Sequence, residues 1–169
     1  RNKTSFTKTK MRKVKYIKHD MIKNLNTKYK IDYIINCIVT HPYSKKNKLQ
    51  DYIDSNIITS KNIISLAKKQ NINLLINLSS VVVYGRPNQK NITENTPIQN
   101  LDFLGTTKLF FEKALEFENI NYVNLRLPGV LCKTFDNKRP WLNTLISQIK
   151  NNKNVKIYNG NSNFNNLIT

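Results

Sequence analysis

The chain has 169 residues, 39% of them hydrophobic, so it is long and apolar enough to form one domain with a core. Its 28 Lys and Arg against 10 Asp and Glu give a formal net charge of +18, which raises nucleic acid or an anionic surface as a partner. Lysine, asparagine and isoleucine are all over-used, so AT-rich codon usage explains the charge equally well. No apolar run approaches the roughly 20 residues of a membrane span, and no secretory signal is visible. Cys37 and Cys132 are the only cysteines, which argues against a disulfide framework and predicts a cytoplasmic protein.

The first half of the chain predicts two strands and one helix after a basic start. Residues 1–13 are basic and polar, and we expect a loop or ragged end there. Alternating residues over 14–20 predict a strand that ends at Asp20, and the more apolar stretch 32–39 predicts a second strand. From 49 to 70, apolar and small residues recur at three- and four-residue steps, which predicts a helix.

The second half continues the alternation around a buried strand at 72–78. A polar loop follows over 86–100, and we expect a helix at 101–118 and a strand at 121–126. We expect a further helix at 140–150, opened by proline, and a short strand at 155–158. Strands that alternate with helices predict an α/β fold with a parallel sheet.

Two serines and one lysine are candidate functional residues on this scheme. Ser79 and Ser80 follow the buried strand, and open parallel sheets bind ligands outside the carboxyl ends of their strands. The alternative is that both hydroxyls only bond local backbone. Lys108 lies on the apolar stripe of the helix at 101–118, where an unpaired lysine is costly to bury. The alternative is that its amine reaches water past the core.

Several segments, in order, resemble the NAD-dependent epimerase/dehydratase group of the extended short-chain dehydrogenases/reductases, which modify nucleotide sugars. The segments are LSSVVVYG at 78–85, ITENTP at 92–97, GTTK at 105–108, DSNI at 54–57, LRLPGV at 125–130 and FNN at 164–166. The resemblance covers roughly residues 14–169, and each segment alone is a weak signal. A branch concerned with surface polysaccharide sugars is the nearest match.

The resemblance implies a Rossmann-like doubly wound parallel sheet and a set of site residues. Residues 14–129 would form a partial NAD-binding domain, and 130–169 would begin the substrate-binding region. The implied catalytic residues are Ser80 and Lys108. The implied contacts to NAD or NADP are Asp20, Met21, Asn36, Cys37, Lys108 and Pro128. The implied contacts to a nucleotide-sugar substrate are Ser80, Glu94 and Asn165, and no metal is expected.

Two departures from the family pattern limit what the resemblance implies. The family's tyrosine, which exchanges a hydroxyl proton, lies four residues before the lysine, and this chain has Leu104 there. The family also begins with a strand, a glycine-rich turn and a helix that binds pyrophosphate, and none of the four glycines matches that turn. We therefore expect an incomplete sheet without the first βαβ unit, a fragment of a longer protein, and weak or absent NAD binding.

Three functions remain open at this point. The first is a nucleotide-sugar epimerase, dehydratase or reductase. The second is a non-catalytic relative that binds a nucleotide or sugar nucleotide, which would explain Leu104. The third is a basic nucleic-acid-binding module, which is disfavoured because no recognised nucleic-acid motif is present. The resemblance also suggests a homodimer through the two long helical stretches, 51–69 and 101–118.

Overall fold

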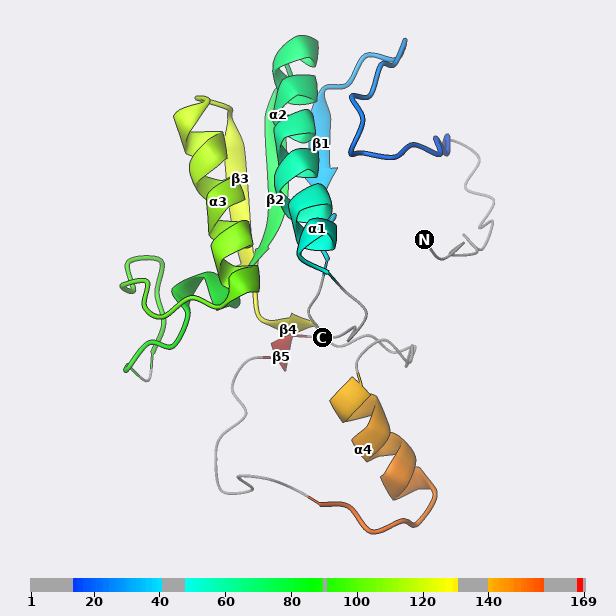
Figure 1. The fold of residues 1–169 in the computed structure, drawn as a ribbon, viewed down its shortest axis with the longest axis vertical. Coiled ribbons are helices and arrows are strands. Elements are labelled where there is room, and N and C mark those ends of the chain that lie inside the picture. Colours follow the sequence, from blue (N-terminus) through cyan, green and yellow to red (C-terminus); the bar gives the residue numbers. More distant parts are fainter. Residues whose placement is uncertain (1–13, 41–47, 90, 131–139, 157–166, 169) are drawn as a thin grey trace.

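A three-stranded parallel sheet forms the centre of the protein (Figure 1). The computed structural model describes residues 14–40, 48–89, 91–130, 140–156 and 167–168, without the side chains of 140–143 and 167–168. The strands are β1 (Tyr33–Asn36), β2 (Leu74–Ser80) and β3 (Tyr122–Leu127), in the order β1-β2-β3. A small second sheet, which the sequence did not predict, pairs β4 (Gly129–Val130) with β5 (Leu167–Ile168). The predicted α/β fold with a parallel sheet is confirmed.

The helices connect these strands as the periodicity predicted. The first is continuous from α1 (Leu49–Tyr52) through a π-helical segment (Ile53–Ile58) to α2 (Thr59–Gln70), and only the π-helical interior was unexpected. The second, α3 (Phe103–Phe117), begins after Asp102, whose Oδ1 accepts a 2.7 Å hydrogen bond from the Gly105 amide. The third, α4 (Pro140–Lys150), starts at the proline.

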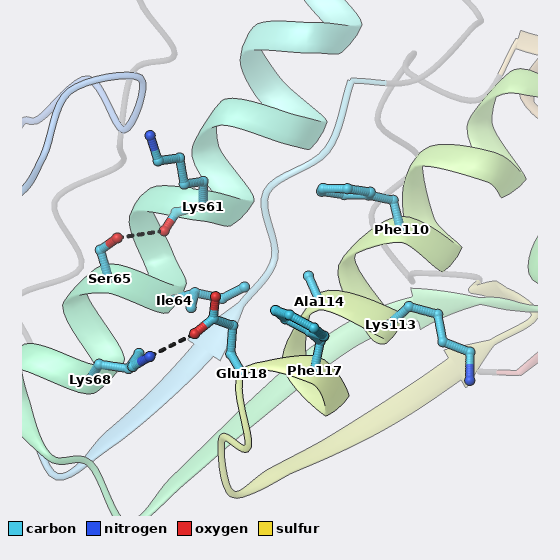
Figure 2. Close-up of a pocket in the computed structure, with 9 residues that line it drawn as sticks. All are labelled: Lys61, Ile64, Ser65, Lys68, Phe110, Lys113, Ala114, Phe117 and Glu118. Carbon is cyan, nitrogen blue, oxygen red and sulfur yellow. Dashed lines mark hydrogen bonds and ion pairs between the residues drawn. The ribbon is translucent and has the colours of Figure 1, made fainter.

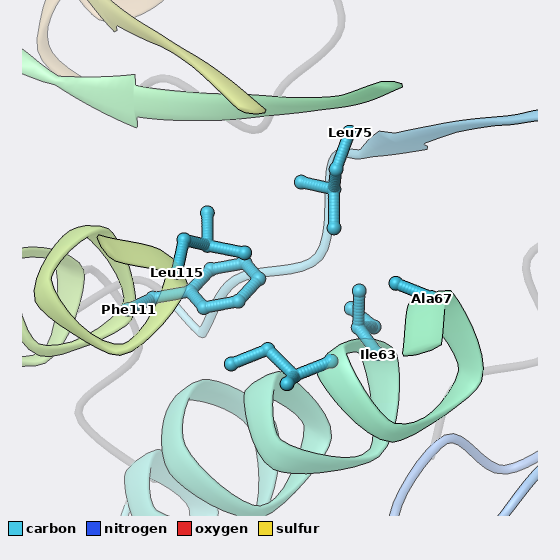
Figure 3. Close-up of a cluster of buried hydrophobic side chains, with 6 residues drawn as sticks. Ile63, Ala67, Leu75, Phe111 and Leu115 are labelled. Atoms are coloured by element: carbon cyan, nitrogen blue, oxygen red, sulfur yellow. The ribbon is translucent and has the colours of Figure 1, made fainter. Parts of the chain in front are cut away.

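The core lies between the sheet and the pair of helices α2 and α3, which cover one face of the sheet (Figures 1 and 3). Leu75 on β2 and Leu115 on α3 are fully buried in it. Its remaining members are Ile63, Ile64, Ala67 and Phe111. Burial of these side chains supplies the main attraction between helices and sheet, so this core determines where the strand ends lie relative to α3.

The opposite face of the sheet is uncovered by the described part of the chain. Strand residues alternate between the faces, and on the uncovered face Tyr33 is 65% exposed, Ile35 63% and Val123 42%. Doubly wound parallel sheets carry helices on both faces. The described residues therefore leave one face of this sheet apolar and exposed.

Three asparagines form a hydrogen-bonded row across the sheet. Asn36, Asn77 and Asn124 are direct neighbours in register on β1, β2 and β3. The Asn36 amide donates to Asn77 at 3.0 Å, and the Asn77 amide donates to Asn124 at 2.8 Å. Since a slip of one residue would turn these side chains to the other face, the row favours the observed register.

Two predicted strands are not confirmed. The stretch 14–20 is not a strand, and Val14, Tyr16 and Ile17 are exposed. A strand needs a neighbour for its backbone groups, and no described strand lies beside this stretch. Residues 155 and 156 are not in a strand either, while 157 and 158 lie outside the described residues.

Candidate active site at the strand ends

Ser79 and Ser80, at the end of β2, have different environments. Ser79 is buried on the helix side, where its hydroxyl donates to Glu112 Oε1 on α3. Ser80 caps the short 3-10 helix Val81–Tyr84, and its Oγ accepts a hydrogen bond from the Val82 amide at 3.3 Å. A hydroxyl that accepts this bond keeps its own proton to donate, so Ser80 can still bind a ligand oxygen.

Lys108 is anchored at the same strand end. Its Nζ donates a 2.6 Å hydrogen bond to the carbonyl oxygen of Leu78. Leu78 lies two residues before Ser80, the last residue of β2, so this bond anchors Lys108 to the backbone of the strand end. Burial lowers the pKa of the Lys108 amine, and the charges of Glu112 and then Cys37 oppose this effect. Lys108 is therefore held by the strand end, and does not merely reach past the core to water.

Asn36 and Cys37 lie at the end of the neighbouring strand. The Asn36 side chain is buried, and its Oδ1 accepts a 3.1 Å hydrogen bond from the Ile38 amide. Cys37 follows the last residue of β1 and is an exposed free thiol. The structure thus brings Asn36, Cys37, Ser80 and Lys108 to one edge of the sheet.

Asn56 connects this edge to α3. It is buried in the π-helical segment, where its Oδ1 accepts from the Thr40 amide at 2.9 Å. Its Nδ2 donates to Thr107 Oγ1 at 3.0 Å, and Thr107 directly precedes Lys108. π-Helical turns occur frequently at functional sites. Asn56 therefore holds the chain after β1 against the helical turn that carries Lys108.

No phenol replaces the missing tyrosine among the described residues near Lys108. Leu104 is 6% exposed and has no proton to exchange. Tyr84 is buried, and the Arg126 guanidinium lies 4.7 Å from the centre of its ring. Phe103 packs edge-to-face on Tyr52, with ring centres 5.0 Å apart. The acid/base group of the family is thus absent from this part of the site.

Of the remaining predicted residues that the structure describes, only Pro128 joins this edge, where it follows the end of β3 beside Ser80. Glu94 and Pro128 line a hollow of about 890 Å³ beside β3, and Val81, which follows Ser80, lines it as well. Met21 packs against the core on the flank of α2, and its carbonyl accepts a 2.8 Å hydrogen bond from Asn62. Asp20 precedes it in a turn, where its Oδ1 accepts from the Ile22 amide at 3.3 Å. Asn165 lies outside the described residues.

Glu112 is a residue that the sequence reasoning missed. Its buried carboxylate pairs with Arg126, with 2.7 Å between Oε2 and Nη2. The hydrogen bonds to Glu112 are the main cause of the raised pKa of Arg126. An acid four residues after Lys108, next to the apolar stripe of a helix, is the signal that could have identified it.

The strand-end edge fits part of a nicotinamide cofactor. An ammonium fixed at a strand end, as Lys108 is, can donate hydrogen bonds to ribose hydroxyls. No glycine-rich turn between a strand and a helix occurs in the described ranges, so those residues provide no backbone cradle for a pyrophosphate. The part of the chain that the structure describes contains no helix long and apolar enough to cross a membrane.

Known proteins resemble this chain in both sequence and fold. A UDP-glucose 4-epimerase from Lactobacillus helveticus is 30% identical over 99 residues, which cover 56% of this chain and 30% of the relative. The structure of a UDP-glucose 4-epimerase from Bifidobacterium longum with NAD+ and UDP has a TM-score of 0.56 at 29% identity, over 61% of this chain and 33% of that one.

A third relative shows the likeness in fold at lower sequence identity. A variant UDP-glucuronic acid 4-epimerase from Bacillus cereus, in complex with NAD and a fluorinated UDP-glucuronic acid, superposes with a TM-score of 0.71 at 21% identity. That match covers 85% of this chain and 48% of the other. The chain thus spans about a third to a half of the length of these relatives.

The profile of the NAD dependent epimerase/dehydratase family matches residues 1–165, nearly the whole chain. The parallel strands β1-β2-β3 follow one another in chain order across the sheet and are joined by helices, as in one half of a doubly wound sheet. The sequence match and this topology agree, and the chain belongs to the NAD-dependent epimerase/dehydratase family.

Proposed function

We propose that the full-length protein binds NAD or NADP together with a nucleotide sugar, and that Ser80 and Lys108 contact these ligands. The observation that carries the proposal is the anchoring of the Lys108 amine by Leu78, on the strand that ends in Ser80. When bound, the cofactor supplies a hydride acceptor. Lys108 would hold its ribose, and the Ser80 hydroxyl would orient a sugar oxygen. We also propose that the protein acts in surface polysaccharide synthesis. Residues 130–169 would begin the substrate-binding region.

Replacement of Lys108 by methionine tests this site. We expect the variant to bind NAD about 10- to 100-fold more weakly, because a hydrogen bond from a charged donor contributes roughly 1.5–3 kcal/mol. Calorimetric titration of the full-length protein with NAD+ measures the loss. The matched control is Lys113→Met, which removes an exposed lysine of the same helix that pairs with Glu116. Equal affinities of Lys108→Met and the parent protein would contradict the proposal, as would the absence of saturable NAD binding.

A second candidate is a relative that binds these ligands without catalysis. The presence of Leu104 favours it, since leucine cannot take the hydroxyl proton that must leave with the hydride. This candidate predicts NAD binding without turnover of any UDP-sugar. Steady formation of NADH, measured by absorbance, or of an epimerised sugar, measured by chromatography, would rule out this candidate.

We also propose a homodimer through the outer faces of α2 and α3. A hollow of about 560 Å³ lies between the two helices, and Figure 2 shows Phe110, Ala114 and Phe117 of α3 facing it. Phe117 is 87% exposed and Phe110 47%, which is unusual for aromatic side chains of a monomer. On the rim, Lys68 pairs with Glu118 within the chain at 2.6 Å.

Replacement of Phe117 by aspartate is expected to shift the protein from dimer to monomer, because a carboxylate would be buried without a partner at the contact. Light scattering after gel filtration measures the mass. Phe117 is exposed in the single chain, so the variant should keep the fold of each chain, which circular dichroism checks. A wild-type protein that is monomeric at micromolar concentration would contradict the homodimer.

A further inference from the structure

The buried carboxylate of Glu112 lies where α3, β2 and β3 meet. Glu112 is on α3, one helical turn after Lys108, and is 4% exposed. Its oxygens accept hydrogen bonds from Ser79 on β2 and from Arg126 on β3. Ser79 and Arg126 are cross-strand partners in the sheet. One carboxylate on the helix therefore bridges the ends of both strands.

Each of these two contacts is a short step along the chain from a predicted site residue. Ser79 directly precedes Ser80, and Arg126 lies two residues before Pro128. A buried ionised carboxylate is stable only when it is paired, and here the guanidinium offers Nε at 3.1 Å and Nη2 at 2.7 Å to Oε2. Rotation of Glu112 would break these contacts together, so its position is well determined.

We propose that Glu112 is a positioning residue, which fixes the strand ends that carry Ser80 and Pro128 against the helical turn that carries Lys108. Glu112 acts through Ser79 and Arg126, and its carboxylate is occupied by them. The ligand contacts of Ser80 and Lys108 rest on the proposed function, whereas the coupling of Glu112 to both residues can be measured in the protein without ligands.

The charge of Glu112 determines in which direction a substitution shifts the pKa of Lys108. Burial lowers the pKa of the Lys108 amine, and the negative charge of Glu112 is the main opposing influence, followed by Cys37. Within the described ranges, the charges that act on the Lys108 amine are those of Glu112 on α3 and Cys37 after β1, and Arg126 of β3 is paired with Glu112. Loss of the Glu112 charge disfavours the ammonium, whereas loss of the Arg126 charge leaves the carboxylate to favour it.

Two variants with opposite expected signs test the proposal by NMR titration of the ligand-free protein with 13C-labelled lysine. In Glu112→Gln the pKa of Lys108 is expected to fall, and in Arg126→Gln it is expected to rise. The Lys108 signal is assigned by its loss in Lys108→Arg. The matched control is Glu116→Gln, which removes an exposed acid of the same helix that pairs with Lys113 and should leave Lys108 unchanged.

The backbone amide of Val82 provides a second readout, because it donates to Ser80 Oγ. Its signal is expected to move in Glu112→Gln and in Arg126→Gln, and to stay in place in Glu116→Gln. If one variant fails to fold, the direction of the Lys108 pKa shift in the other variant tests the proposal. An unchanged Lys108 pKa, a shift of the wrong sign or an unmoved Val82 amide would overturn the role of Glu112. Absence of NAD binding by the parent protein would overturn the proposed function. The Lys108 pKa and the Val82 signal would still test the role of Glu112, because both are measured without ligand.

Discussion

Replacement of Leu104 by tyrosine is expected to raise turnover of a UDP-sugar by the full-length protein roughly 10²- to 10⁴-fold, the usual contribution of a positioned acid/base group. Position 104 lies one helical turn before Lys108 on α3, so a phenol there would have the lysine amine beside it. A nearby ammonium lowers the pKa of a phenol toward neutrality and allows it to take the hydroxyl proton as hydride leaves the same carbon. Epimerisation or NADH formation at several pH values measures the gain.

The matched control for this change is Leu104→Phe, which introduces the same ring without the hydroxyl. Leu104 is buried, so either ring costs about 1–3 kcal/mol of overpacking, and both variants should lose similar thermal stability. A gain in Leu104→Tyr alone assigns the rate to the phenol. Equal turnover in the two variants and the parent would mean that the missing tyrosine is not what limits this site, and would favour the non-catalytic candidate.

Replacement of Gly85 by alanine is expected to destabilise the fold by about 3 kcal/mol or more, because two independent penalties combine. Gly85 has φ 69° and ψ −119°, a conformation that side chains with a Cβ rarely adopt. An added Cβ would also lie 1.7 Å from the carbonyl oxygen of Gln99, whose backbone pairs with Tyr84 and Arg86 on both sides of the glycine. Chemical denaturation followed by circular dichroism measures the loss.

The control for Gly85 is Asn71→Gly at the end of α2. Asn71 also has a positive φ, 48°, and glycine adopts that conformation without strain, so the free energy of unfolding should change by only a few tenths of a kcal/mol. A Gly85→Ala variant as stable as the parent would mean that the turn after Tyr84 rearranges freely. In that case, something other than this turn would fix the end of the Val81–Tyr84 helix beside Ser80.

Local patterns predicted most of the elements because they depend on neighbours along the chain. The apolar run of β2, the three- and four-residue spacing of α2 and α3, and the proline at the start of α4 each act within a few residues. The ordered motifs also predicted the family. The stretch 14–20 had a strand pattern too, but a strand needs a partner, and partners depend on contacts distant in sequence.

The sequence by itself determined the α/β class, the parallel sheet, the family and the absence of a tyrosine at position 104, since these follow from residue identity and local order. Only the tertiary structure decided what the polar side chains do inside the sheet. It selected Leu78 as the acceptor for Lys108, joined Ser79, Glu112 and Arg126, and aligned the row of asparagines. The reason is physical: a buried polar group must be paired, and its partners lie on other elements that only folding brings within 3 Å or so.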